Sequence, residues 1–394
     1  MSSCAQQPPE FPITHNIGAA IRLLFHSQLF ITPPAPTQTF TNQTVIITGA
    51  NRGVGLEAAR HFYRLDCARL IIAGRDVERG QVAKEDILSS VESRARSESD
   101  AAAIEVWYLD LRSTESTIAF ADRVKTELDR VDVLVEDAGI HTGVFELVEG
   151  VESAVQVNVL NTCLLALLLL PKLEENSDRR DDGDGVPHLV VVSSEAHRYT
   201  SFPEINEPDL YEEMRGREGW EKFPRYCATK LIQLLFIREL VDRLKQRRQK
   251  NKAKAPTSFP SPSPPPQPTG PPSEPEPEPD PEVQAPPRVI INLVTPGFCS
   301  TPFGSDGKPF PLLVRIIRGI LDRTVEVGSR TLVLAASAPA TSHGEFQADG
   351  KNQDVEAWIY GDVGRRVQGK VFEQTARVLE TRYPGVMRGF GLKG

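Results

Sequence analysis

Of the seven tyrosines in this 394-residue chain, only Tyr226 has a lysine, Lys230, four positions further on. Both lie in a segment with helical periodicity, so the two side chains share one helix face. A tyrosine hydroxyl can give a proton to a carbonyl oxygen that is being reduced, but its ordinary pKa is about 10. A neighbouring ammonium group stabilises the tyrosinate and lowers that pKa. The pair therefore predicts acid–base chemistry in the interconversion of a carbonyl and an alcohol.

A glycine-rich turn offers a place for a cofactor. The apolar run TVIITG is followed by ANRGVG and then by a helical pattern, LEAARHF. Gly49, Gly53 and Gly55 supply a tight turn and let the backbone approach a ligand without a Cβ in the way. The helix that follows presents free N–H groups and the positive end of its dipole to a pyrophosphate. A strand before this turn and a helix after it predict a dinucleotide site.

Short β-branched runs alternate with helical patterns and must position these residues. The runs span 44–49, 68–74, 103–111, 131–139, 188–194 and 288–297. Near-continuous apolar strands, each followed by a helix, predict one doubly wound Rossmann-type α/β domain. We expect a parallel sheet of about seven strands with helices on both faces. Ligand sites of such folds lie outside the carboxyl ends of the strands, where the glycine turn falls.

The TGxxxGxG turn and the YxxxK pair together resemble the short-chain dehydrogenase/reductase family over roughly residues 40–390. The resemblance implies that Ser194 holds the substrate oxygen, with Ser193 as the alternative. It also implies that Asn158 helps to organise a proton-relay water, although an ordinary cap or kink asparagine would look the same. Lys230 would additionally bind the nicotinamide ribose. The implied catalytic set is Asn158, Ser194, Tyr226 and Lys230.

Charges near the glycine turn bear on which nicotinamide cofactor is used. Arg52 lies within the turn and Arg75 follows the second strand. Two guanidinium groups match the extra phosphate of NADP, and in the family basic residues at these places go with NADP(H). Asp76 would instead favour the ribose hydroxyl of NAD. The prediction is NADP(H), with NAD(H) as the alternative.

The resemblance extends to further cofactor contacts. Asp110 corresponds to a family aspartate that meets the adenine ring, and Thr301 to a threonine that bonds the carboxamide or phosphate. The family's NNAG segment reads EDAG here, so Asp137 replaces an asparagine and cannot donate as an amide does. The predicted cofactor-binding set is Gly49, Arg52, Gly53, Gly55, Arg75, Asp110, Asp137, Tyr226, Lys230 and Thr301.

Two weaker resemblances concern the substrate. The long segment between Ser194 and Tyr226 is similar to that of the retinol-dehydrogenase-like branch of the family. The beginning of the protein, around SQLFITPPAPTQTFTNQTVIITGAN, is similar to filamentous-fungal members, which implies a role in fungal secondary metabolism. Both imply a fairly large, lipophilic carbonyl or alcohol as the small-molecule substrate.

Composition excludes several other classes. With a net charge of −8 and a pI near 5.6, no general electrostatic field favours binding to nucleic acid or to an anionic membrane. Five scattered cysteines without a CxxC pair favour a reduced, cytoplasmic location without a disulfide framework or a zinc site. The first forty residues lack the features of a signal peptide. The apolar run VLNTCLLALLLL stops at Pro171, so it predicts a buried helix and not a membrane span, which needs roughly 20 residues.

The predicted organisation is an N-terminal extension over 1–40 and one domain over 41–394, interrupted by a proline-rich insertion at 250–287. We expect the insertion to be a disordered linker, with an SH3-type ligand as the alternative. The insertion and Asp137 also leave open a second function, a cofactor-binding regulatory or scaffold protein. A homodimer through the helices that carry Asn158 and Tyr226 is possible.

Overall fold

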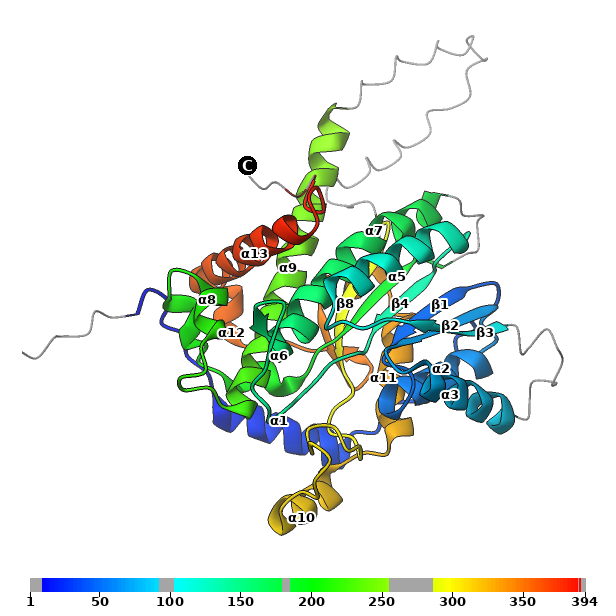
Figure 1. Ribbon diagram of the computed structural model, residues 1–394, viewed down its shortest axis with the longest axis horizontal. Helices are drawn as coiled ribbons and strands as arrows, with labels where there is room; N and C mark the ends of the chain where they lie inside the picture. The colour runs from blue at the N-terminus through cyan, green and yellow to red at the C-terminus, as the bar shows by residue number, and fades with distance from the viewer. Residues whose placement is uncertain (1–8, 92–102, 179–184, 255–285, 389, 391–394) are drawn as a thin grey trace, which may run out of the picture.

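An eight-stranded sheet forms the centre of the computed structural model, which describes residues 9–91, 103–178, 185–254, 286–388 and 390 (Figure 1). The strand order is β10-β9-β8-β7-β4-β1-β2-β3, and every neighbouring pair is parallel except β9 with β10. This is the predicted doubly wound Rossmann-type arrangement. The strands are β1 (Thr44–Thr48), β2 (Arg69–Gly74), β3 (Ile104–Tyr108), β4 (Val133–Glu136), β7 (His188–Val192), β8 (Ile290–Thr295), β9 (Phe346–Ala348) and β10 (Lys351–Asn352).

The predicted count of about seven strands is corrected to eight. The six runs identified from their apolar residues are β1, β2, β3, β4, β7 and β8. Strands β9 and β10 contain only three and two residues, too few to show a period-2 pattern. A separate hairpin, β5 (Leu147–Val148) with β6 (Val151–Glu152), lies outside the main sheet.

Helices cover both faces of the sheet, because the strand side chains are apolar on both sides. Helices α2 (Gly53–Arg64), α3 (Val77–Ser90) and α11 (Val325–Ala335) share one hydrophobic cluster, which includes Val45 and Ile47 of β1. The other cluster includes Ile46 of the same strand and packs against α5 (Thr114–Glu127), α7 (Thr162–Asp178), α9 (Lys222–Lys254) and α13 (Asp362–Arg382). Burial on both faces explains the near-continuous apolar runs in the sequence.

One helical stretch in the described part of the chain, Ser153–Ser177, is long and apolar enough to cross a membrane, and its apolar window is fully buried. It consists of α6 (Ser153–Val155), the π-helical turn η1 (Gln156–Asn161) and α7. The prediction of a buried helix is confirmed.

The remaining helices are shorter or lie outside these two layers. They are α1 (Ile17–Phe30), η2 (Glu195–Tyr199), η3 (Pro203–Asn206), α8 (Leu210–Arg215), α10 (Leu312–Leu321), η4 (Ala340–Ser342) and α12 (Ala357–Tyr360). Helix α9 continues to Lys254, so it passes the predicted start of the proline-rich insertion at residue 250. The rest of that insertion, 255–285, lies outside the described residues.

Candidate active site

The glycine turn between β1 and α2 brings bare backbone to the carboxyl edge of the sheet. Gly49 has a φ of 75°, and a Cβ on it would lie 2.9 Å from the Cα of Ala138. Gly53 has a φ of 62° and begins α2. Arg52, at the N-cap of this helix, makes no side-chain bond to the first-turn amides. These features fit a dinucleotide, because a pyrophosphate needs close backbone approach and free N–H groups.

Asp137 lies against the third glycine of this turn. A Cβ on Gly55 would be 2.5 Å from Asp137 Oδ2, and the Gly55 N–H donates to the Asp137 carboxylate. Burial raises the pKa of Asp137 to about 7, although the charge of Lys230 and the Gly55 bond oppose the rise. Asp137 therefore bonds the glycine turn and also experiences the charge of the lysine of the YxxxK pair. An acceptor suffices for the Gly55 bond, so the exchange of asparagine for aspartate does not break the turn.

Tyr226 and Ser194 meet through their hydroxyl groups. A hydrogen bond joins the two side chains, and Ser194 also caps η2 by accepting from the Ala196 N–H at 3.1 Å. Ser193 Oγ, in contrast, is buried and has no hydrogen-bond partner among the described residues. The geometry therefore favours Ser194 over Ser193. Burial raises the pKa of Tyr226 above its ordinary value, while the Ser194 bond opposes the rise.

Lys230 is buried one helical turn after Tyr226 on α9. Its Nζ donates to the Val192 carbonyl at 2.7 Å and to Gln233 Oε1 at 3.3 Å, and lies 6.0 Å from the centroid of the Tyr226 ring. Burial lowers the pKa of Lys230 to about 8, against the opposing charge of Asp137. The ammonium group therefore lies near the end of β7, on the same face of α9 as the tyrosine. The i, i+4 spacing predicts that shared face.

Asn158 lies in the π-helical turn η1, an irregularity that often occurs at functional sites. Its side chain accepts from the Ile140 N–H at 2.8 Å and donates to the Ile140 carbonyl at 2.9 Å and to Thr229 Oγ1 at 3.2 Å. Its backbone carbonyl accepts from Gln233 Nε2 at 3.2 Å. The side chain therefore ties the β4 loop to α9, and the carbonyl is linked to Lys230 through Gln233.

Two aromatic residues outside the predicted catalytic and cofactor-binding sets lie against Tyr226. The His141 ring stacks on the Tyr226 ring, with centroids 4.5 Å apart and planes 23° apart, and Phe303 meets it edge-on at 5.9 Å. Burial, together with Lys222, lowers the pKa of His141 to about 4. His141 follows Gly139 by two residues, and this place after a strand end was the one signal that could have identified it.

The loop after β8 is held over His141 by contacts across the site. Asp306 accepts from the Gly143 N–H at 3.0 Å and forms an ion pair with Lys222. Gly304 approaches so closely that a Cβ on it would lie 2.7 Å from His141 Nδ1. Thr301 of the same loop lies over the glycine turn, with its Cγ2 3.6 Å from a Cβ placed on Gly53. The loop thus covers the tyrosine and the cofactor turn together.

Some charged side chains near the glycine turn have bonding partners among the described residues, and others have none. Asp76 caps α3 by accepting from the Arg79 N–H at 3.0 Å, and it pairs with the Arg79 side chain at 3.1 Å. Arg52 and Arg75 are exposed and make no hydrogen bond or ion pair with any described residue. Asp110 accepts from the Arg112 N–H at 2.9 Å in the turn after β3. Two guanidinium groups therefore remain available to a ligand, whereas the Asp76 carboxylate is occupied.

The chain is similar to known proteins of one enzyme family. Residues 43–203 match the family model described as short chain dehydrogenase. A short chain dehydrogenase/reductase of the fungus Cryptosporiopsis is 32% identical, over 93% of this chain and 99% of its own length. A short chain dehydrogenase of Emericella nidulans is 36% identical, over 82% of this chain and 90% of its own.

Solved structures share the fold at low identity. An uncharacterised protein of Mycobacterium paratuberculosis superposes with a TM-score of 0.56 at 22% identity, over 89% of this chain and all of its own. A short chain dehydrogenase of Salmonella enterica gives 0.50 at 17% identity, over 80% of this chain and 99% of its own. These structures show the shared fold, and the full-length similarity to the fungal enzymes shows that the chain belongs to the short-chain dehydrogenase/reductase family of oxidoreductases.

Proposed function

We propose that this enzyme is an NADP(H)-dependent oxidoreductase that interconverts a carbonyl and an alcohol on a lipophilic small molecule, with Tyr226 as general acid and base. The observation that carries the proposal is the hydrogen bond between Tyr226 and Ser194, with the Lys230 ammonium buried behind the tyrosine. Three polar groups from two elements converge at the carboxyl end of β7, where ligands of this fold bind.

Each residue has a distinct role in reduction. The cofactor supplies the hydride when it is bound. Ser194 holds the carbonyl oxygen by a hydrogen bond, and the Tyr226 hydroxyl donates the proton that this oxygen takes up. Lys230, whose pKa is about 8, is largely protonated at neutral pH and stabilises the tyrosinate left behind. In the oxidative direction the same tyrosine accepts the proton.

The preference for NADP(H) rests on the two unpaired guanidinium groups. Arg52 and Arg75 would hold the extra phosphate, since arginine matches phosphate geometry. Asp76, the residue that would favour NAD(H), already caps α3. Gly49, Gly53, Gly55 and Thr301 would line the remaining cofactor path.

A lipophilic substrate is supported by the aromatic surroundings of the tyrosine. His141, neutral at physiological pH, and Phe303 contact the Tyr226 ring, and Phe223 lies 6.3 Å from both His141 and Tyr199 between ring centroids. Such walls favour an apolar ligand with one polar group. An apolar substrate is in keeping with the proposed similarity to the retinol-dehydrogenase-like branch. That similarity, the cytoplasmic location and the homodimer all stay predictions.

The test is turnover of a panel of lipophilic ketones and aldehydes by the full chain with NADPH or NADH. We expect NADPH-dependent reduction of at least one aliphatic or aromatic carbonyl, and binding of NADPH tighter than that of NADH by fluorescence titration. NADPH binding without turnover of any member would favour the alternative of a cofactor-binding scaffold, which the carboxylate of Asp137 also motivates. Deletion of residues 255–285 separates the two, because a scaffold would lose its partner while an enzyme keeps its rate.

A further inference from the structure

Exposed large hydrophobic side chains are concentrated on α1 and α10. These two helices carry more than half of all such side chains in the described residues. The most exposed are Phe30 on α1, at 76%, and Leu312 and Leu313 on α10, at 71% and 69%. Phe298 and Phe303, between β8 and α10, extend the same surface. A contiguous apolar surface of this kind marks a binding face.

Each helix exposes a continuous apolar face. On α1 the exposed residues recur every four positions (Ile17, Ile21, Phe25 and Leu29), so they form one stripe. On α10 only Leu321 of the apolar residues is buried. Arg315 and Arg318, three positions apart, share the opposite side of α10. Apolar residues on one side and arginines on the other are the pattern of a helix that lies in a membrane interface.

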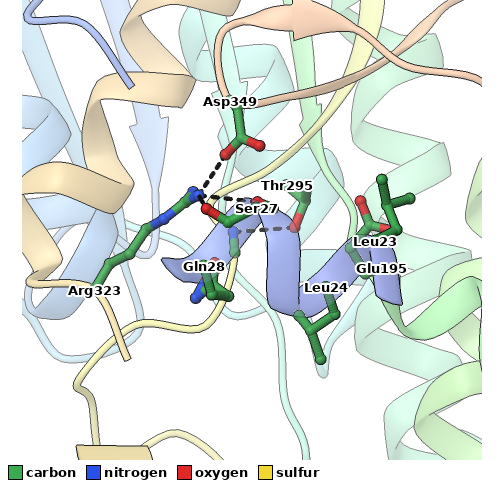
Figure 2. Close-up of a pocket in the computed structure, with 9 residues that line it drawn as sticks. Leu23, Leu24, Ser27, Gln28, Glu195, Thr295, Arg323 and Asp349 are labelled. Atoms are coloured by element: carbon green, nitrogen blue, oxygen red, sulfur yellow. Dashed lines mark hydrogen bonds and ion pairs between the residues drawn. The ribbon is translucent and has the colours of Figure 1, made fainter. Parts of the chain in front are cut away.

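Specific bonds hold the two helices together with their apolar faces outward. Gln28 Nε2 donates to the Leu321 carbonyl at 2.9 Å and to the Phe298 carbonyl at 3.0 Å. Arg323, ion-paired with Asp349, donates to the Ser27 carbonyl at 2.8 Å. Figure 2 shows Ser27, Gln28, Arg323 and Asp349 around a small cavity beside α1. In Figure 1 both helices lie at the same end of the molecule, and α10 projects away from the sheet.

The charged residues within these two helices are all basic. Neither α1 nor α10 contains an aspartate or glutamate, although the chain as a whole has a net charge of −8. Arg318 pairs with Asp322 at 2.8 Å. Arg22 and Arg315 are exposed and form no ion pair within the described ranges. An apolar surface bordered by free cations is complementary to anionic headgroups over an apolar interior.

We propose that α1 and α10 form a docking face that binds the surface of an anionic lipid bilayer. The helices contain 14 and 10 residues, which at 1.5 Å per residue are too short to cross about 30 Å of hydrocarbon. They therefore lie in the interface and do not span it. A two-fold dimer through the same face is disfavoured, because it would bring the cationic borders of two copies together. Phe303 joins this face to Tyr226, so the docked surface adjoins the active site.

The experiment is flotation of the purified full chain with phosphatidylcholine vesicles and with the same vesicles containing phosphatidylserine. We expect binding to the anionic vesicles. Leu313→Glu/Ile317→Glu should weaken it by about a hundredfold or more, since each side chain loses the burial of a large aliphatic group. Arg22→Gln/Arg315→Gln should weaken it by about fivefold per arginine, and added salt should have the same effect.

Val82→Glu on α3 is the matched control, since Val82 is 66% exposed on a different part of the surface. It should bind vesicles as the wild type does. All variants replace exposed residues, so their thermal unfolding midpoints should equal that of the wild type. Absence of wild-type flotation with anionic vesicles would overturn the proposal. So would a concentration-dependent dimer that Leu313→Glu/Ile317→Glu abolishes, because a second copy would then cover the face.

Discussion

Two connections at the carboxyl edge of the sheet are built in different ways. One is the turn between β1 and α2, called here the glycine side, and the other is the segment between β8 and α11, called the β8 side. After β1 the chain turns at once into α2, and three glycines within seven residues set the conformation of that turn. After β8 the chain makes a long excursion through Thr301, Phe303 and α10 before it returns in α11. That excursion is held by side chains from distant parts of the sequence, such as Gln28, which bonds a carbonyl 270 positions away.

Under the proposed function, this difference separates most of the cofactor site from substrate recognition, while Thr301 of the β8 side also lies over the glycine turn. The glycine side depends on backbone geometry, so it tolerates few changes and serves a ligand that all family members share. The β8 side depends on individual side-chain contacts, so its shape can vary while the sheet stays intact.

Tyr226→Phe should remove the proton donor and reduce kcat by a factor of about a hundred to ten thousand. NADPH binding should change little, because the hydroxyl bonds Ser194 and not the glycine turn. Steady-state kinetics and fluorescence titration measure the two effects. Turnover equal to that of the wild type would contradict the proposed mechanism.

Gly49→Ala should destabilise the glycine side by about 1–3 kcal/mol and weaken NADPH binding, because its φ is 75° and the new Cβ would lie 2.9 Å from Ala138 Cα. Urea unfolding and cofactor titration provide the measurement. Gly369→Ala on α13 is the control, since its Cβ meets no atom within 4 Å and alanine favours a helix. Equal stability of the two variants would show that the turn is less constrained than described.

Asp137→Asn should change the pH dependence of the free energy of unfolding. The folded-state pKa of Asp137 is raised from 3.8 to about 7, so its contribution to stability is present at low pH and is lost as pH rises through about 7. The free energy of unfolding of the wild type should therefore fall by roughly 2 kcal/mol between about pH 4 and pH 7, whereas that of the variant should not. This figure is reduced to allow for the attraction between Asp137 and the charge of Lys230.

Urea unfolding of both proteins across this range measures the effect. Lys230 affects stability over a different pH range. Its pKa is lowered from 10.5 to about 8, so its contribution to the free energy of unfolding rises with pH between these values in both proteins. Parallel curves for wild type and variant below about pH 7 would mean that Asp137 is ionised throughout.

Arg75→Gln should weaken NADPH binding by about tenfold and leave NADH binding unchanged, because only NADPH carries the extra phosphate. Arg79→Gln is the control, since Arg79 is paired with Asp76 and is equally exposed on the same segment. Titrations of both variants with both cofactors decide the matter. An equal loss for NADPH and NADH would refute the phosphate role.

Gln28→Ala should have the smallest effect, a loss of about 1 kcal/mol in the free energy of unfolding, because two partly exposed hydrogen bonds to the β8 side disappear. Gln81→Ala on the exposed side of α3 is the control and should cost nothing measurable. A shift in KM for a lipophilic substrate without a change in NADPH binding would sharpen the division between the two sides.

Much of the framework could be predicted from sequence. Runs such as 44–49 and 188–194 correspond to β1 and β7, because strands buried on both faces must be apolar throughout. Strands β9 and β10 could not be found, since three and two residues carry no periodic signal. The resemblance to the family supplied the roles of Ser194 and Asn158. The structure then favoured Ser194 over Ser193 by its bond to Tyr226.

Local patterns in the sequence predict six strands of the sheet, the glycine turn and the Tyr226–Lys230 pair, because strand periodicity, glycine geometry and helix spacing are local properties of the chain. What surrounds that pair depends on tertiary packing. His141 on the tyrosine ring, Asp137 between Gly55 and Lys230, and α1 fixed beside α10 each depend on contacts between segments far apart in sequence. Such contacts follow from how complete elements pack, and no local pattern of residues records them.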